Sequence, residues 1–149
     1  MNSGSDGLMP ARLALDTSAY SRFRAGDGRV HDLLSAAELI IVPAIVLGEL
    51  HGAFEFGARA RVNRLTLAQF LAEPFVTIAP ANVDVVRRYG KAYAALRRAG
   101  RTIPVNDMWI AATAMASGAC LLTFDRDFTH VAGLDHLLLE GVEPGTDRD

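Results

Sequence analysis

The chain has only one cysteine, Cys120, among its 149 residues. A single thiol excludes an internal disulfide framework and a zinc site built from cysteines. No apolar run approaches the ~20 residues that a transmembrane helix needs, and the first ten residues lack the basic and then apolar pattern of a signal peptide. We therefore expect a protein that does not enter a membrane and that resides in the cytoplasm.

Lysine is also scarce, because Lys91 is the only lysine among 15 basic residues, and the formal net charge is −2. This balance gives no overall attraction to nucleic acid, so any such contact must come from local groups of arginines. The sequence has no Gly-rich phosphate loop and no nucleophile-elbow serine, which disfavours nucleoside-triphosphate and acyl-transfer chemistry. Its four histidines show no metal-ligand spacing.

Length and composition indicate one globular domain over residues 11–142, between a disordered leader (1–10) and a disordered tail (143–149). Within it, short apolar runs alternate with stretches of helical periodicity. The predicted strands are 12–15, 39–42, 75–78, 119–123 and 135–139, and the predicted helices are 18–24, 30–37, 44–57, 58–71, 82–99 and 107–117. This order predicts an α/β fold with a mainly parallel sheet covered on both faces. We expect a Thr/Ser cap before the first helix and Asn106 to cap the last.

Four acidic residues stand at positions that such a fold would bring together. Asp16 follows the apolar run 13–15, and Asp125 follows the run 119–124, so both come where a predicted strand ends. Glu49 lies inside the apolar helical stretch 44–56, and Asp107 opens another, 107–114. Because function in parallel sheets gathers at the carboxyl ends of the strands, we expect these four side chains to converge there.

Each acid also has a purely structural interpretation. Asp16 could form an Asp/Thr turn, Asp107 could complement a helix dipole, and Asp125 with Asp127 could form a solvated turn. Glu49 is the hardest to explain in this way, because an unpaired carboxylate is disfavoured among hydrophobic neighbours. The occurrence of two strand-end acids and two helix acids in this order favours a shared site.

Converging carboxylates repel one another unless a cation neutralises them. Carboxylate oxygens suit Mg²⁺ or Mn²⁺, and a site with few protein ligands leaves coordination positions for water and phosphate. One or two such ions activate water and stabilise a leaving oxygen. The acids therefore predict a hard-metal site whose chemistry fits phosphodiester hydrolysis.

The chain resembles the PIN-domain ribonucleases, specifically the VapC type of toxin from bacterial toxin–antitoxin pairs. The resemblance extends over nearly the whole chain, from about Leu13 to Leu139. It is carried by four motifs in order, namely LDTS at 15–18, VLGEL at 46–50, NDMWIAATA at 106–114 and TFDRDF at 123–128. None of the motifs is specific alone, but their order and spacing make the match strong.

The resemblance implies a three-layer α/β/α sandwich and Mg²⁺- or Mn²⁺-dependent endonucleolytic cleavage of RNA, with tRNA, rRNA and mRNA all compatible as targets. It implies homodimerisation and inhibition by a cognate VapB-type antitoxin whose C-terminal segment plugs the active site. Thr17 and Thr123 would orient the metal ligands through hydrogen bonds. The acids that it implies as catalytic and metal-binding residues are Asp16, Glu49, Asp107 and Asp125, with Asp127 as an accessory metal ligand.

Two other functions remain open at the level of sequence. A metal-dependent phosphatase would use a similar sheet, although Asp16 is followed by Thr17-Ser18 and not by a second acid two residues on. A non-catalytic module would use the acids only to dock an arginine-bearing peptide. Arg22 and Arg24 are our candidates for contact with a substrate or an antitoxin.

Overall fold

A computed structural model describes residues 9–141 of the chain. The expected leader and tail lie almost wholly in residues 1–8 and 142–149, outside the described residues. The strands are β1 (Arg12–Leu15), β2 (Leu39–Pro43), β3 (Val76–Ala79), β4 (Cys120–Thr123) and β5 (His136–Leu138). The helices are α1 (Thr17–Arg24), α2 (Gly28–Ala36), α3 (Ala44–Phe56), α4 (Ala60–Leu71), α5 (Val83–Arg98), α6 (Val105–Ala116) and the 3₁₀ helix η2 (Arg126–His130).

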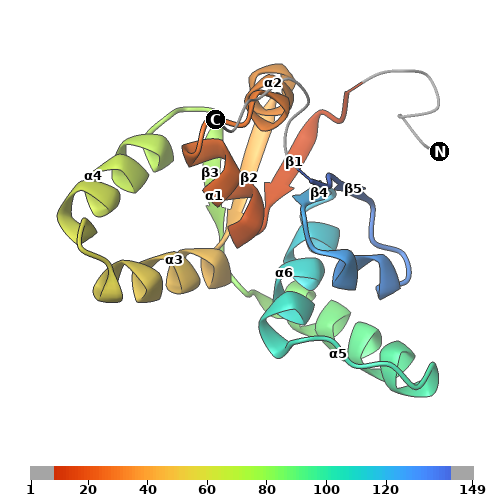
Figure 1. Ribbon diagram of the computed structural model, residues 1–149. Helices are drawn as coiled ribbons and strands as arrows, with labels where there is room; N and C mark the ends of the chain where they lie inside the picture. The colour runs from red at the N-terminus through yellow and green to blue at the C-terminus, as the bar shows by residue number, and fades with distance from the viewer. Residues whose placement is uncertain (1–8, 142–149) are drawn as a thin grey trace.

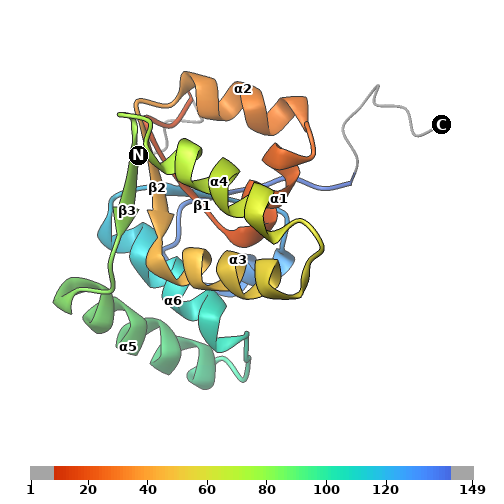
Figure 2. The ribbon, with the colours of Figure 1, turned by 90° about the vertical axis from the view of Figure 1, so that its left-hand side faces the viewer.

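The five strands form one parallel sheet in the order β3-β2-β1-β4-β5. The chain moves from β1 outward to β3 through α1–α4, then crosses back through α5 and α6 to β4 on the other side of β1. Because parallel crossovers are right-handed, this reversal of direction places the two sets of helices on opposite faces of the sheet. Figures 1 and 2 show these layers, which confirm the predicted α/β/α sandwich.

The core lies at the centre of the sheet, where the strands are continuous apolar runs. β4 is buried at every position, and in β1 only Arg12 is exposed. A strand with helices on both faces needs no polar side, which is why neither sequence alternates. The carboxyl ends of β1 and β4 are neighbours, because Leu15 is in register with Leu122. The residues that follow these two strands therefore emerge side by side.

The end of α6 is fixed by a glycine. Gly118 has a positive φ of 62°, a conformation that favours glycine. The amide of Gly118 donates to the carbonyl of Met115, and the amide of Ala119 donates to that of Ala114. This pair of bonds is a Schellman motif, which ends the helix and directs the chain into β4.

No helix within residues 9–141 is long and apolar enough to cross a membrane.

Substitution Leu121→Ala in the central strand is expected to lower the free energy of unfolding by about 2–5 kcal/mol, because it leaves a cavity in a close-packed core. Leu121 is fully buried, whereas Ile78 on the edge strand β3 is 47% exposed. The matched variant Ile78→Ala should cost about 1 kcal/mol or less. Urea denaturation measures the free energy of unfolding of both variants. An equal loss in the two would contradict the assignment of the core to β1 and β4.

Candidate active site

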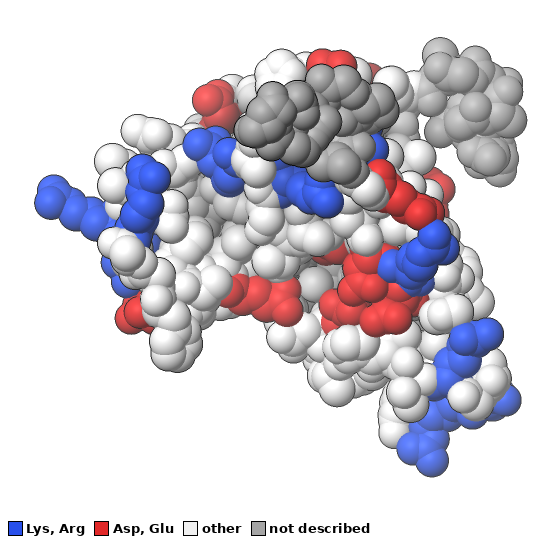
Figure 3. All heavy atoms as spheres, viewed as in Figure 1, with Lys and Arg blue, Asp and Glu red and all other residues white. Residues whose placement is uncertain are grey.

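The carboxyl edge of the sheet carries a cluster of five acidic side chains. Asp16 directly follows β1, Asp125 and Asp127 come just after β4, α3 supplies Glu49 and the first turn of α6 supplies Asp107. Figure 3 shows acidic side chains gathered on this face of the molecule. We refer to these five residues as the acid cluster.

Asp16 is buried and held by three donors. Its Oδ1 accepts hydrogen bonds from the Ser18 hydroxyl (2.7 Å) and the Ala19 amide (2.8 Å), and its Oδ2 accepts one from the Thr123 hydroxyl (2.5 Å). The bond from Ala19 makes Asp16 itself the N-cap of α1. The expectation of a Thr/Ser cap was wrong by one position, because the carboxylate reaches the free amides of the first turn better.

Glu49 is half-buried on α3 and accepts one hydrogen bond at each carboxylate oxygen. The Thr17 hydroxyl donates to Oε1, and the Asn106 amide donates to Oε2 at 3.3 Å. The expectation that Asn106 caps α6 was wrong: the helix begins at Val105, with Pro104 at the N-cap position and no side-chain cap. Asn106 is instead a first-turn residue whose side chain reaches across to α3.

The other three acids lie within reach of one common cation. Oxygen atoms of Asp107, Asp125 and Asp127 all lie within 4.8 Å of one another. Opposite ligands of a Mg²⁺ ion are about 4.2 Å apart, so small rotations would let these oxygens share one ion. Asp125 also accepts the amide of Asp127 at 2.9 Å and so caps η2. The two acids thus belong to a 3₁₀ turn, an element that we did not predict.

The cluster changes the titration of two of its members. Burial, together with the negative charges of Asp125, Glu49, Asp127 and Asp16, raises the pKa of Asp107 to about 7. Burial also raises the pKa of Asp16, against the hydrogen bonds from Thr123, Ala19 and Ser18 that lower it. Asp107 therefore feels the charge of all four other carboxylates of the cluster.

The donor set fits a hard divalent cation. Every member of the acid cluster offers carboxylate oxygen, and within residues 9–141 none of the five forms an ion pair with arginine, lysine or histidine. Asp16 has about four lone-pair sites, of which three are occupied, so one remains for a cation. In the described part of the chain no basic side chain pairs with these acids, and a bound metal would supply the positive charge.

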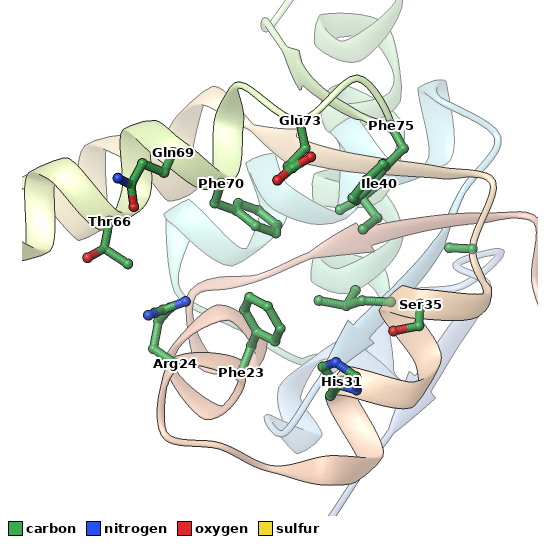
Figure 4. A pocket seen from close by; sticks show the side chains of 12 residues that line it. Phe23, Arg24, His31, Ser35, Ile40, Thr66, Gln69, Phe70, Glu73 and Phe75 are labelled. Carbon is green, nitrogen blue, oxygen red and sulfur yellow. The ribbon is translucent and has the colours of Figure 1, made fainter.

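The two candidate arginines of α1 point to different places. The guanidinium of Arg22 lies 4.5 Å from the centre of the ring of Phe124, the residue before Asp125. Arg24 lines a separate cavity of about 500 Å³ with Phe23, Thr66 and Phe70, which Figure 4 shows between α1 and α4. None of the five acids lines that cavity.

Two residues beside the acids escaped the sequence analysis. Ser18 donates to Asp16 and accepts the amide of Phe124 (3.0 Å), so its hydroxyl ties β1 to β4. Asn106 was expected only to cap α6, and its bond to Glu49 was not predicted. A signal was present for Ser18, since it belongs to the motif LDTS, but its partner lies 106 residues away. Trp109, which belongs to the motif at 106–114, is stacked on Tyr89 with ring centroids 4.0 Å apart, which joins α6 to α5.

Comparison with known proteins agrees with this geometry. The family model described as "PIN domain" matches residues 13–134. The chain is 27% identical over 124 residues to ribonuclease VapC5 of Mycobacterium tuberculosis, which covers 83% of this chain and 90% of the relative. It is 38% identical over 91 residues to ribonuclease VapC4 of the same organism, which covers 58% of this chain and 67% of the relative.

A solved structure also resembles this chain in fold and sequence. The crystal structure of VapBC-5 from Mycobacterium tuberculosis, a member of the VapBC family of toxin–antitoxin systems, matches with a TM-score of 0.69 and 25% sequence identity. The match covers 87% of this chain and 100% of that chain. With a family model over most of its length and two VapC ribonucleases among its relatives, this chain belongs to the PIN-domain family, in the VapC group.

Proposed function

We propose that the protein is the toxin of a toxin–antitoxin pair and acts as a Mg²⁺- or Mn²⁺-dependent endoribonuclease in the cytoplasm. The observation that carries the proposal is the acid cluster, in which three carboxylates are arranged for one cation and two more are hydrogen-bonded beside them. The relatives VapC4 and VapC5 are ribonucleases, which supports RNA as the substrate. Which of tRNA, rRNA or mRNA is cut would depend on surface shape around the site.

Each acid has a part that its contacts support. Asp107, Asp125 and Asp127 would hold the ion through their converging oxygens. Asp16 would offer its remaining lone pair, and Glu49 would accept hydrogen bonds while facing the same site. When bound, the metal lowers the pKa of a coordinated water and polarises the phosphodiester.

Thr123 and Thr17 would act as positioning residues. Thr123 donates to Asp16 and accepts the amide of Asp125 at 2.9 Å, so one hydroxyl relates the two strand-end acids. Thr17 donates to Glu49, which fixes α3 relative to the start of α1. Such outer contacts keep carboxylates in the orientation that a metal needs.

The partners follow from the relatives. The solved VapBC-5 structure belongs to a toxin–antitoxin family, which supports a VapB-type antitoxin for this chain. The C-terminal segment of this antitoxin would reach the acid cluster, and an arginine in that segment would neutralise the same carboxylates as the metal. We also propose that the active form is a homodimer. Contact of Arg22 and Arg24 with a substrate or the antitoxin stays a prediction.

Asp16→Asn and Asp107→Asn are each expected to reduce RNA cleavage by about 100-fold or more, because each removes a negative ligand atom from the cluster. Asn is as good an N-cap as Asp, so Asp16→Asn should retain the fold. The measurement is mapping of cut ends in total cellular RNA with and without Mn²⁺. Asp32→Asn, an exposed acid on α2, is the matched control and should cut normally. Full metal-dependent cleavage by both variants would contradict the assignment.

That assay also separates the alternatives. Turnover of a chromogenic phosphomonoester with RNA left intact would favour a phosphatase. Tight antitoxin binding with no cleavage at any Mg²⁺ or Mn²⁺ concentration would favour a non-catalytic module.

The pKa of Asp107, raised to about 7, predicts how stability depends on pH. An acid whose pKa is higher in the folded state favours folding at low pH, and this contribution is lost as pH rises from about 4 to 7. Metal-free Asp107→Asn should therefore melt at a higher temperature than wild type at pH 8 but not at pH 4. Thermal melts in EDTA measure this, and equal melting temperatures at pH 8 would contradict the coupling.

Addition of metal should reverse the order of the two melting temperatures, so that the wild type melts above Asp107→Asn. Mg²⁺ or Mn²⁺ at about 100 times its Kd would stabilise the wild type by about 2.7 kcal/mol, and the variant by much less. Apparent metal affinity of the wild type should rise with pH toward neutrality, because the ion competes with the proton on Asp107.

A further inference from the structure

Two arginines lie close to one aromatic ring, that of Phe124, whose neighbour in the sequence is Asp125. The guanidinium carbons of Arg22 and Arg29 lie 4.5 and 5.6 Å from the centre of the Phe124 ring. Phe124 immediately precedes Asp125, and its backbone amide donates to the Ser18 hydroxyl, which donates to Asp16. We refer to Arg22, Arg29 and Phe124 as the arginine clamp.

A buried carboxylate fixes the clamp. Asp27 is 7% exposed, and both its oxygens accept hydrogen bonds from Arg29, at 3.2 Å from Nε and 2.8 Å from Nη2. Arg22 approaches the same carboxylate at 3.6 Å. The hydrogen bonds and the positive charge of Arg29 hold the pKa of Asp27 below its usual value. The guanidinium groups are thus oriented before any ligand arrives, which reduces the entropy that binding costs.

Oxygen atoms already occupy the outward donors of the clamp. Arg22 Nη1 donates to the carbonyl of Gly141 at 3.1 Å. Arg29 donates to the carbonyls of Glu140 (3.1 Å) and Gly141 (3.2 Å). Two neighbouring carbonyl oxygens on a pair of guanidinium groups have the arrangement that two oxygens of one phosphate would adopt.

We propose that the arginine clamp binds a backbone phosphate of the RNA next to the phosphodiester that is cut, with phosphate oxygens replacing the carbonyls of Glu140 and Gly141. This inference rests on the proposed function. Five carboxylates repel a polyanion, and a metal ion offsets only part of that charge. A fixed cationic pair beside them supplies attraction where the substrate must lie. The clamp's guanidinium groups form the planar donor pairs that suit phosphate.

The position also favours RNA over an acidic peptide. The clamp and the acid cluster meet in the segment 123–125. The ring of Phe124 contacts Arg22, and the two residues beside it, Thr123 and Asp125, belong to the candidate active site. A phosphate held by the clamp would therefore lie against the residue that separates Thr123 from Asp125. The ring itself adds a surface on which a base could stack.

The test compares Arg22→Gln and Arg29→Gln with wild type and with Arg12→Gln. Arg12 is a matched control, because it also donates to a backbone carbonyl, that of Ser117, but lies at the opposite end of β1. A fluorescein-labelled single-stranded RNA is titrated in EDTA over a range of salt concentrations, and cleavage of the same RNA is measured with Mn²⁺. Binding to fluorescein-labelled poly-glutamate is the comparison ligand.

Each clamp variant should weaken RNA binding about tenfold and reduce the slope of log K against log salt by about 0.7, the value for one phosphate contact on a single strand. KM for cleavage should rise by a similar factor while kcat changes little, because the clamp binds substrate and transition state alike. Arg12→Gln should match wild type in all three readouts. If Arg29→Gln fails to fold after losing its bonds to Asp27, Arg22→Gln decides the question.

The outcomes separate the two claims. Wild type that cuts RNA while Arg22→Gln binds and cuts equally well would overturn the clamp and leave the proposed function intact. Loss of poly-glutamate binding with RNA binding unchanged would also overturn it, in favour of an acidic protein partner. Wild type that neither binds nor cuts RNA with metal would refute the proposed function, and the clamp with it.

Discussion

Uncompensated negative charge at the carboxyl edge of the sheet is the constraint on which the rest of the structure depends. Five carboxylates meet there, and within residues 9–141 the hydrogen bonds to Asp16, Glu49 and Asp125 come from neutral donors, not from cations. Neutral donors orient a carboxylate without cancelling its charge. Burial and the charges of the other four acids raise the pKa of Asp107, and a divalent ion would relieve that repulsion. An arginine in the same place would have stabilised the fold and removed the site.

The fold must hold the five carboxylates together although they repel one another. Asp16 is fixed by α1, by Ser18 and by Thr123, so it cannot turn away from its neighbours. The adjacent register of β1 and β4 brings the two strand-end acids together, and buried apolar strands supply the free energy that keeps them there. The two arginines of the clamp pair with Asp27, whose single negative charge offsets only one of their two positive charges.

Much of this arrangement is predictable from the sequence because it depends on local patterns. The apolar runs that end at Leu15 and Thr123 are strands in the structure, and their carboxyl ends carry the expected acids. The errors lie at helix starts. Asn106 follows a proline and has a residue type that commonly caps helices, yet its side chain bonds to Glu49, 57 residues away. Local propensity favours a cap, whereas the position of α3 beside α6 offers a different acceptor.

The sequence by itself determined the order of strands and helices, the parallel sheet and the identity of the acids, because hydrophobic periodicity and residue type act over a few neighbouring positions. Only the tertiary structure decided how those acids are held. The bonds from Thr17 to Glu49, from Thr123 to Asp16 and from Arg29 to the carbonyls of 140–141 join segments remote in the chain. Such contacts depend on register and packing angle, to within the length of a hydrogen bond, and no local pattern encodes that distance.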